Sequence, residues 1–102
     1  MTRKRITPVG RLFEKIRGLV LEGRYVVGQH AVERLDERGG LEWQVIDGIA
    51  YGQLLAERPD AVPNPAVEVR QLLADGTEIK AVWSHLASAD VAKLVTVHFF
   101  DA

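Results

Sequence analysis

Hydrophobic residues in the first half of the chain recur with the three- and four-residue spacing of amphipathic helices. This spacing predicts helices near residues 8–22, 30–38 and 41–51. Thr7 and Pro8 are typical of an N-cap and a first-turn proline, so we expect the first helix to begin there. Gly39 and Gly40 end the second helix. Gly48 lies inside the third, where glycine costs roughly 1 kcal/mol relative to alanine.

The second half of the chain changes to the two-residue alternation of β-strands. Alternating segments predict strands at 53–58, 66–73, 77–83 and 91–100. Asp75-Gly76 separates the middle two strands and is a strong hairpin signal. The segment "RYVV" before the second helix is either a short strand or an extended link. Three helices followed by about four strands predict an α+β domain, with N-terminal helices packed on a C-terminal antiparallel sheet.

The same alternation assigns strand residues to two faces of the sheet. One face of the last strand should pack under the helices and carries Val95, Val97 and Phe99. The other face carries Leu94, Thr96, His98 and Phe100. Arg70 and Lys80 point to this second face from the hairpin, so a basic cluster with Thr96 and His98 forms if the strand register permits it. The predicted core contains Leu12, Ile16, Leu35, Ile46, Val69, Ile79, Val95 and Val97.

Length and composition indicate one globular domain over residues 1–102. We divide it into a basic tail (1–7), a helical part (8–51) and a sheet (52–102). The chain has no cysteine, which excludes disulfides and thiolate metal sites, and its three histidines lack metal-binding spacing. We therefore expect no metal and no cofactor. Apolar runs are far shorter than the ~20 residues of a membrane span, and the first residues lack the apolar segment of a secretory signal, so we expect a cytoplasmic protein that does not contact membranes.

The formal net charge of −1 hides an asymmetry between the two halves. Residues 1–40 carry nine Lys/Arg against five Asp/Glu, and residues 41–102 carry four against nine. A basic half joined to an acidic half is suited to nucleic acid or to a protein partner of mixed charge. The near-neutral total counts against tight nonspecific binding of nucleic acid.

His30, Arg34 and Arg38 are spaced four residues apart on the second predicted helix. Each is offset from the last by about 40° around the helix axis, so together they form one stripe that suits a phosphate backbone. The competing interpretation is structural. Arg34 can pair with Glu37 or anchor loop carbonyls, and Arg38 is stabilised by the dipole at the end of the helix.

Three further residues are assigned structural or solvent-exposed positions. His85 lies in "SHLASAD", which we expect to be a solvated loop. Trp43 and Trp83 are predicted to be core residues or partner anchors rather than platforms for stacking nucleic-acid bases.

The segments "HAVERLDERGG" and "LVTVHF", with the helix and strands between them, resemble the bacterial family called domain of unknown function 4258 (DUF4258). The leading "FEKIRGLVLEGRYVV" is similar to the start of the motility quorum-sensing regulator toxins, which cleave messenger RNA. This resemblance implies a RelE- or barnase-like fold from the barnase–EndoU–colicin–RelE ribonuclease superfamily, and metal-independent RNA cleavage. The motif residues map to His30, Arg34, Arg38 and Thr96. Gly40 is an added glycine, and His98 stands where the family has an aromatic residue.

Two hypotheses from different functional classes follow. The first is a small metal-independent endoribonuclease, the toxin of a toxin–antitoxin pair, with His30 and His98 as the acid and base. Its RNA phosphate contacts would be Arg34, Arg38, Arg70, Lys80 and Thr96. The second is a catalytically silent module of the same fold that binds ribosomal RNA or a protein. The corresponding partners are RNA and a cognate antitoxin or another protein.

Overall fold

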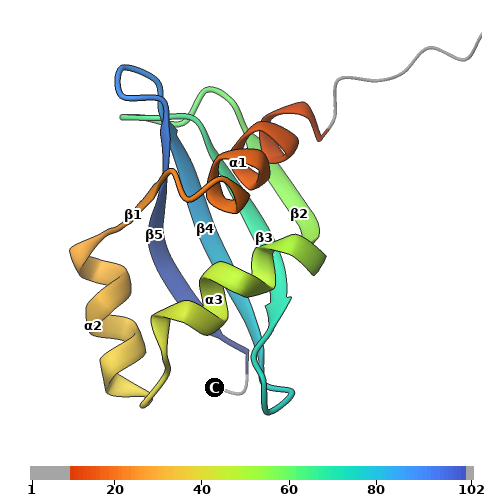
Figure 1. Cartoon of the computed structure of the whole chain (residues 1–102), viewed down its shortest axis with the longest axis vertical. Coiled ribbons are helices and arrows are strands. Elements are labelled where there is room, and N and C mark those ends of the chain that lie inside the picture. The colour runs from red at the N-terminus through yellow and green to blue at the C-terminus, as the bar shows by residue number, and fades with distance from the viewer. Residues whose placement is uncertain (1–9, 101–102) are drawn as a thin grey trace, which may run out of the picture.

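The computed structural model describes residues 10–100 as a layer of helices on a five-stranded sheet (Figure 1). The helical elements are α1 (Arg11–Leu21), α2 (Gln29–Glu37), α3 (Glu42–Gly48) and the short 3-10 helix η1 (Ile49–Tyr51). The strands are β1 (Tyr25–Val27), β2 (Gln53–Arg58), β3 (Ala66–Leu72), β4 (Glu78–Leu86) and β5 (Val91–Phe99). The α+β class predicted from the sequence is confirmed.

The strands lie in the order β1-β5-β4-β3-β2, and β2 to β5 form an antiparallel meander. The fifth strand, β1, pairs in parallel with β5 at Tyr25↔Ala92 and Val27↔Leu94. The four strands predicted from the sequence are present and antiparallel, and the segment left open as a short strand or an extended link is the fifth strand, which is parallel. A three-residue strand shows too little alternation to be distinguished from an extended link.

The helices α1 and α3 lie across one face of the sheet, whereas α2 lies beside the β5 edge (Figure 1). The N-cap of α1 is Gly10, which has a φ of 95° and offers no side chain to cap the helix. The carboxylate of Glu57 on β2 supplies this contact, because it accepts a hydrogen bond of 2.8 Å from the backbone N–H of Phe13. The predicted start at Thr7 and Pro8 lies outside the described residues.

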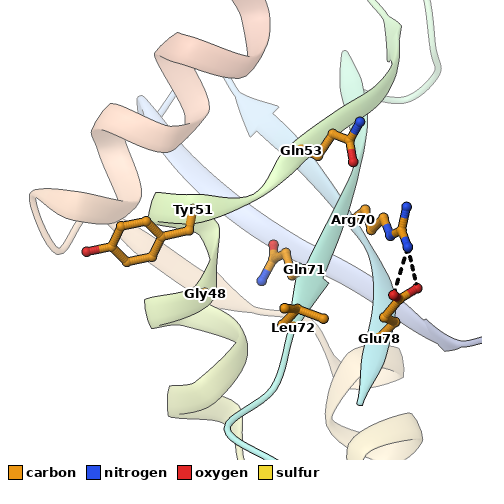
Figure 2. Close-up of a pocket in the computed structure, with 7 residues that line it drawn as sticks. All are labelled: Gly48, Tyr51, Gln53, Arg70, Gln71, Leu72 and Glu78. Carbon is orange, nitrogen blue, oxygen red and sulfur yellow. Dashed lines mark hydrogen bonds and ion pairs between the residues drawn. The ribbon is translucent and has the colours of Figure 1, made fainter. Parts of the chain in front are cut away.

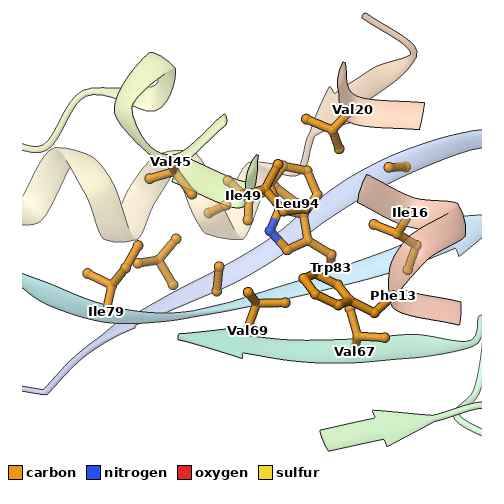
Figure 3. Packing of buried hydrophobic residues seen from close by; sticks show 14 of the residues in the cluster. Phe13, Ile16, Val20, Val45, Ile49, Val67, Val69, Ile79, Trp83 and Leu94 are labelled. Atoms are coloured by element: carbon orange, nitrogen blue, oxygen red, sulfur yellow. The ribbon is translucent and has the colours of Figure 1, made fainter. Parts of the chain in front are cut away.

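The core lies between the sheet and the helices, and Trp83 at its centre is fully buried (Figure 3). Of the predicted core residues, those fully or almost fully buried are Ile16, Leu35, Val69, Ile79 and Val97. Leu12 and Ile46 are partly buried and pack against this cluster. Trp43, in contrast to Trp83, is 56% exposed. The prediction that Val95 belongs to the core was wrong.

A β-bulge explains the error at Val95. The register of β4 and β5 changes between the pairs Trp83↔Leu94 and Val82↔Thr96, so Val95 is an extra residue with no partner. Leu94 is consequently buried on the helix-covered face, where the sequence predicted the opposite face. A second irregularity interrupts the pairing of β2 with β3 at Leu55.

One buried polar side chain ties α3 to the sheet. Gln71 is only 2% exposed. Its amide donates a hydrogen bond of 2.7 Å to the carbonyl of Val45 and accepts one of 3.1 Å from the indole N–H of Trp83. A Cβ at Gly48 would lie 3.0 Å from the Gln71 Nε2 atom. Glycine at this position therefore lets α3 approach β3 closely enough for the bridge to form.

Gln71→Leu leaves the carbonyl of Val45 and the indole N–H of Trp83 without a hydrogen-bond partner. We expect each loss to lower the free energy of unfolding by roughly 1–3 kcal/mol. Chemical denaturation followed by circular dichroism measures this change. Leu72→Ala is the matched control, since Leu72 is 59% exposed and should shift stability by only about 0.5 kcal/mol. Equal losses in both variants would contradict a bridging role for Gln71.

Candidate functional site

A row of polar residues crosses four strands on the sheet face opposite α1 and α3, which we call the open face. Gln53 lies directly opposite Arg70, Arg70 opposite Lys80, and Lys80 opposite His98. With strands about 4.8 Å apart, this row spans roughly 14 Å. The register thus brings together Arg70, Lys80 and His98, three of the residues selected from the sequence.

Carboxylates on the same face partly neutralise these cations. The Arg70 Nη2 atom lies 2.7 Å from both carboxylate oxygens of Glu78. Glu68 lies between two cations, 2.9 Å from Arg58 Nε and 3.6 Å from Lys80 Nζ. The hydrogen bond from Arg58, followed by the attraction of Lys80, lowers the pKa of Glu68 despite some desolvation. The Arg70–Glu78 pair is exposed, and such pairs are worth only about 0–1 kcal/mol, so an incoming phosphate can compete for Arg70.

His98 ends the row on β5, and its side chain is exposed and has no hydrogen bond or ion pair within residues 10–100. Glu78 is its diagonal neighbour, because it lies two residues before Lys80 on β4. Diagonal neighbours in antiparallel strands are about 7–8 Å apart. Glu78 was not selected from the sequence, although its alternation with Ile79 already assigned it to the same face as Lys80.

Thr96 also belongs to the open face but lies outside the row. It faces Val82 across the β4–β5 pair, one position beyond the bulge. Its hydroxyl oxygen is buried and has no hydrogen-bond partner among the described residues.

The two arginines of the α2 stripe contact β5. The Arg34 Nε atom lies 3.4 Å from the carbonyl of Val97, at the edge of β5 beyond the end of β1. Arg34 also lies 3.7 Å from Glu37. The Arg38 guanidinium lies 4.4 Å from the ring centroid of Phe99, a cation–π contact. Arg34 thus anchors a carbonyl, as the structural interpretation holds, although on a strand rather than on a loop.

His30 is exposed in the first turn of α2. Two residues before it, the N–H of Gly28 donates a hydrogen bond of 2.8 Å to the carbonyl of Leu94. His98 lies four residues beyond Leu94 on β5, and at 3.3 Å per residue this separates the two positions by about 13 Å along the strand. No hydrogen bond or ion pair within residues 10–100 links the two histidines, so their pairing as acid and base stays a prediction.

His85 was predicted in a solvated loop, and this was wrong because β4 continues to Leu86. The His85 side chain is only 18% exposed, and its Nε2 atom lies 3.0 Å from Asp90 Oδ1. Lys15 on α1 lies 3.3 Å from the same oxygen. The hydrogen bond from His85, followed by that from Lys15, lowers the pKa of Asp90. This cluster joins α1 to the β4–β5 turn.

A pocket of about 420 Å³ opens beside Gln53 and Arg70, at the β2 end of the row (Figure 2). Its lining residues are Gly48, Tyr51, Gln53, Arg70, Gln71, Leu72 and Glu78. Residues 10–100 contain no group of three His, Asp or Glu side chains placed to hold a metal ion. Across the same residues, every helix is too short or too polar to cross a membrane.

The family comparison covers both α2 and the row on the open face. The sequence model described as Domain of unknown function (DUF4258) matches residues 27–99. The chain belongs to this family. Comparisons with curated proteins and with solved structures found no match. The DUF4258 match extends from the end of β1 to the end of β5, and it leaves α1 outside.

The Asp90 cluster makes stability depend on pH. Because the folded-state pKa of Asp90 is lowered, its contribution is present above the unfolded pKa, near 3.8, and is lost as pH falls through the folded pKa. We therefore expect the stability difference between wild type and Asp90→Asn to be present at about pH 5 and to shrink progressively as the pH falls below it. Thermal melts at graded pH measure this difference. His85→Gln should weaken the effect, and a difference that persists unchanged to pH 2 would contradict it.

Proposed function

We propose that this DUF4258 protein is a small metal-independent endoribonuclease, of the kind that acts as the toxin of a toxin–antitoxin pair, and that RNA lies on the open face. The observation that carries the proposal is the row of Arg70, Lys80 and His98 on adjacent strands. The resemblance of the sequence to RelE-like and quorum-sensing regulator toxins supports the same conclusion.

Cleavage of RNA without a metal requires a base, an acid and a cationic cradle. The base removes the proton of the 2′-hydroxyl, whose oxygen then attacks phosphorus. The bond from phosphorus to the 5′-oxygen breaks, and the acid protonates that oxygen. The products are a 2′,3′-cyclic phosphate and a 5′-hydroxyl end. Arginine and lysine stabilise the charge of the pentacoordinate phosphate.

The open face offers each of these groups. We assign Glu78 and His98 as base and acid, because His98 lies directly across from Lys80 and Glu78 lies two residues before it on β4, so both are neighbours of the phosphate that Lys80 binds. Arg70, aligned by Glu78, contacts a phosphate oxygen with its remaining donors. The earlier arrangement, in which His30 pairs with His98 and the phosphate lies along Arg34 and Arg38, remains the alternative for the second proton-transfer group. Thr96 lies beside the row with its hydroxyl buried, so we assign it no phosphate contact in either arrangement.

A second candidate function is a catalytically silent module that binds ribosomal RNA or a protein partner. The observation that favours it is the pairing of Arg70 with Glu78 and of Lys80 with Glu68, which lowers the net positive charge of the open face. A surface of balanced charge suits recognition better than strong phosphate binding.

Removing either proton-transfer group should slow cleavage sharply. We expect His98→Ala and Glu78→Gln each to lower the rate of RNA cleavage by about 10²–10⁴, the usual worth of a general acid or base. Single-turnover cleavage of a labelled RNA in EDTA measures this rate and excludes a metal contribution. His30→Ala should cleave at the wild-type rate in the Glu78–His98 arrangement.

The variants also separate the alternatives. A large loss in His30→Ala, with Glu78→Gln active, would replace Glu78 by His30 as the partner of His98. Wild-type cleavage in both His98→Ala and Glu78→Gln would overturn the catalytic assignment. RNA binding without cleavage by the wild type would favour the silent module. Circular dichroism melts must show that each variant is folded.

Phosphate contacts should appear in the salt dependence of RNA binding. We expect Arg70→Ala and Lys80→Ala each to make the slope of log K against log salt concentration less negative by roughly 0.7 for single-stranded RNA. Arg17→Ala is the matched control, because Arg17 pairs with Glu14 on α1, on the covered side of the sheet. An equal change of the slope in Arg17→Ala would contradict RNA contact at the open face.

A further inference from the structure

The pocket beside Gln53 and Arg70, at the β2 end of the row, has the volume of a ligand site. Its volume of about 420 Å³ lies within the range of roughly 300–1,000 Å³ that small-molecule pockets occupy. It forms because β3 continues to Leu72, two residues beyond its last pair with β2 at Gln53↔Arg70. Gly48 and η1 close the side opposite the open face (Figure 2). The pocket thus continues the row around the edge of β3.

Its polar groups differ in their availability. The amide of Gln71 is buried and already donates to the carbonyl of Val45 and accepts from the indole of Trp83, which hold its orientation. Arg70 and Glu78 form an ion pair with one another. The amide of Gln53 is exposed and has no hydrogen bond or ion pair within residues 10–100. Gln53 is therefore the side chain through which the pocket can read a ligand.

Tyr51 supplies an aromatic ring at the rim of the pocket. Its exposed fraction of 93% means that it contributes almost nothing to the core. In Figure 2 the ring points outward from η1, away from Gln53 and Arg70. Exposed side chains change rotamer within picoseconds to nanoseconds, so the ring is free to turn over a ligand. Leu72, 59% exposed, offers an apolar wall for the other side of a flat group.

The geometry points to a subsite for an unpaired adenine base of an RNA chain, stacked by Tyr51 and read by Gln53. Unpaired RNA bases are recognised by stacking on aromatic rings and by hydrogen bonds to their edges. A glutamine amide matches the adjacent donor and acceptor of adenine, N6 and N7. Arg70 belongs both to the pocket and to the row, so a base here is attached to a phosphate at Arg70 and a following phosphate at Lys80.

This inference rests on the proposed function in that RNA lies on the open face, but it concerns base selection rather than chemistry. Binding of dye-labelled rA6 and rU6 to the full chain, followed by fluorescence polarisation, tests it directly. We expect the wild type to bind rA6 more tightly. Tyr51→Ala should weaken rA6 binding about tenfold or more, as expected for loss of one stacked base. Tyr51→Phe should restore it, and Gln53→Ala should abolish the preference for rA6 over rU6.

Trp43→Ala is the matched control, since Trp43 is also an exposed aromatic residue, on the helix α3 that contributes Gly48 to the pocket, but does not line the pocket. Wild-type affinity for rA6 in Tyr51→Ala, equal affinity of the wild type for rA6 and rU6, or equal losses in Trp43→Ala would each overturn the subsite. Adenosine monophosphate that binds as tightly as rA6 would show that the pocket takes a free nucleotide, which overturns the RNA assignment.

The proposed function is tested separately, by measuring RNA cleavage by the same proteins. A Tyr51-dependent preference for rA6 without any cleavage retains the subsite and overturns the nuclease. Cleavage that needs His98 but proceeds equally in wild type and Tyr51→Ala, at RNA concentrations below saturation, retains the nuclease and overturns the subsite. Binding of neither oligonucleotide overturns both the subsite and RNA contact at the open face.

Discussion

The hydrogen bond between the Trp83 indole and the Gln71 amide organises the rest of the structure. A fully buried indole N–H must find an acceptor, because an unsatisfied donor in the core costs about 1–3 kcal/mol. Gln71 is that acceptor, and its amide nitrogen then requires an acceptor of its own, the carbonyl of Val45 on α3. The chain from Trp83 to Val45 therefore fixes where α3 lies against the sheet. Gly48 permits the close approach that this position demands.

Most of the large apolar strand side chains pack on the helix-covered face, and most charged side chains of the strands lie on the open face together with a few apolar ones such as Leu72 and Val82. Strand alternation then places Arg70, Lys80 and His98 in line without any loop to position them. Residues on neighbouring strands of a packed sheet are held by the backbone ladder, so the backbone positions of the row are fixed before any ligand arrives. The pocket beside Arg70 arises from a different cause, the unequal lengths of β2 and β3. The open face thus combines a linear cationic surface with a recess at one end.

Alternation was sufficient to predict the four longer strands, the hairpin at Asp75-Gly76 and the face occupied by the row. It failed where the backbone departs from a regular ladder. An extra residue at Val95 exchanges the faces of Leu94 and Val95, and nothing in a run of valine, leucine and threonine indicates where a bulge will form. The contact of His85 with Asp90 and that of Arg34 with Val97 could not be predicted from the sequence, since strand pairing and helix packing bring these residues together. Helical spacing located α2 but not the edge that it covers.

The two edges of the sheet are finished differently. On the β5 side, β1 and Gly28 pair with the edge at residues 92–94, Arg34 contacts the carbonyl of Val97, and α2 packs against β5. On the β2 side the outer backbone belongs to an edge strand interrupted at Leu55. An unbroken edge is a template on which the strand of another molecule can pair, and a bulge disturbs the regular spacing of N–H and C=O groups that such pairing needs. The irregularity at Leu55 therefore protects the sheet against edge-to-edge growth into larger aggregates.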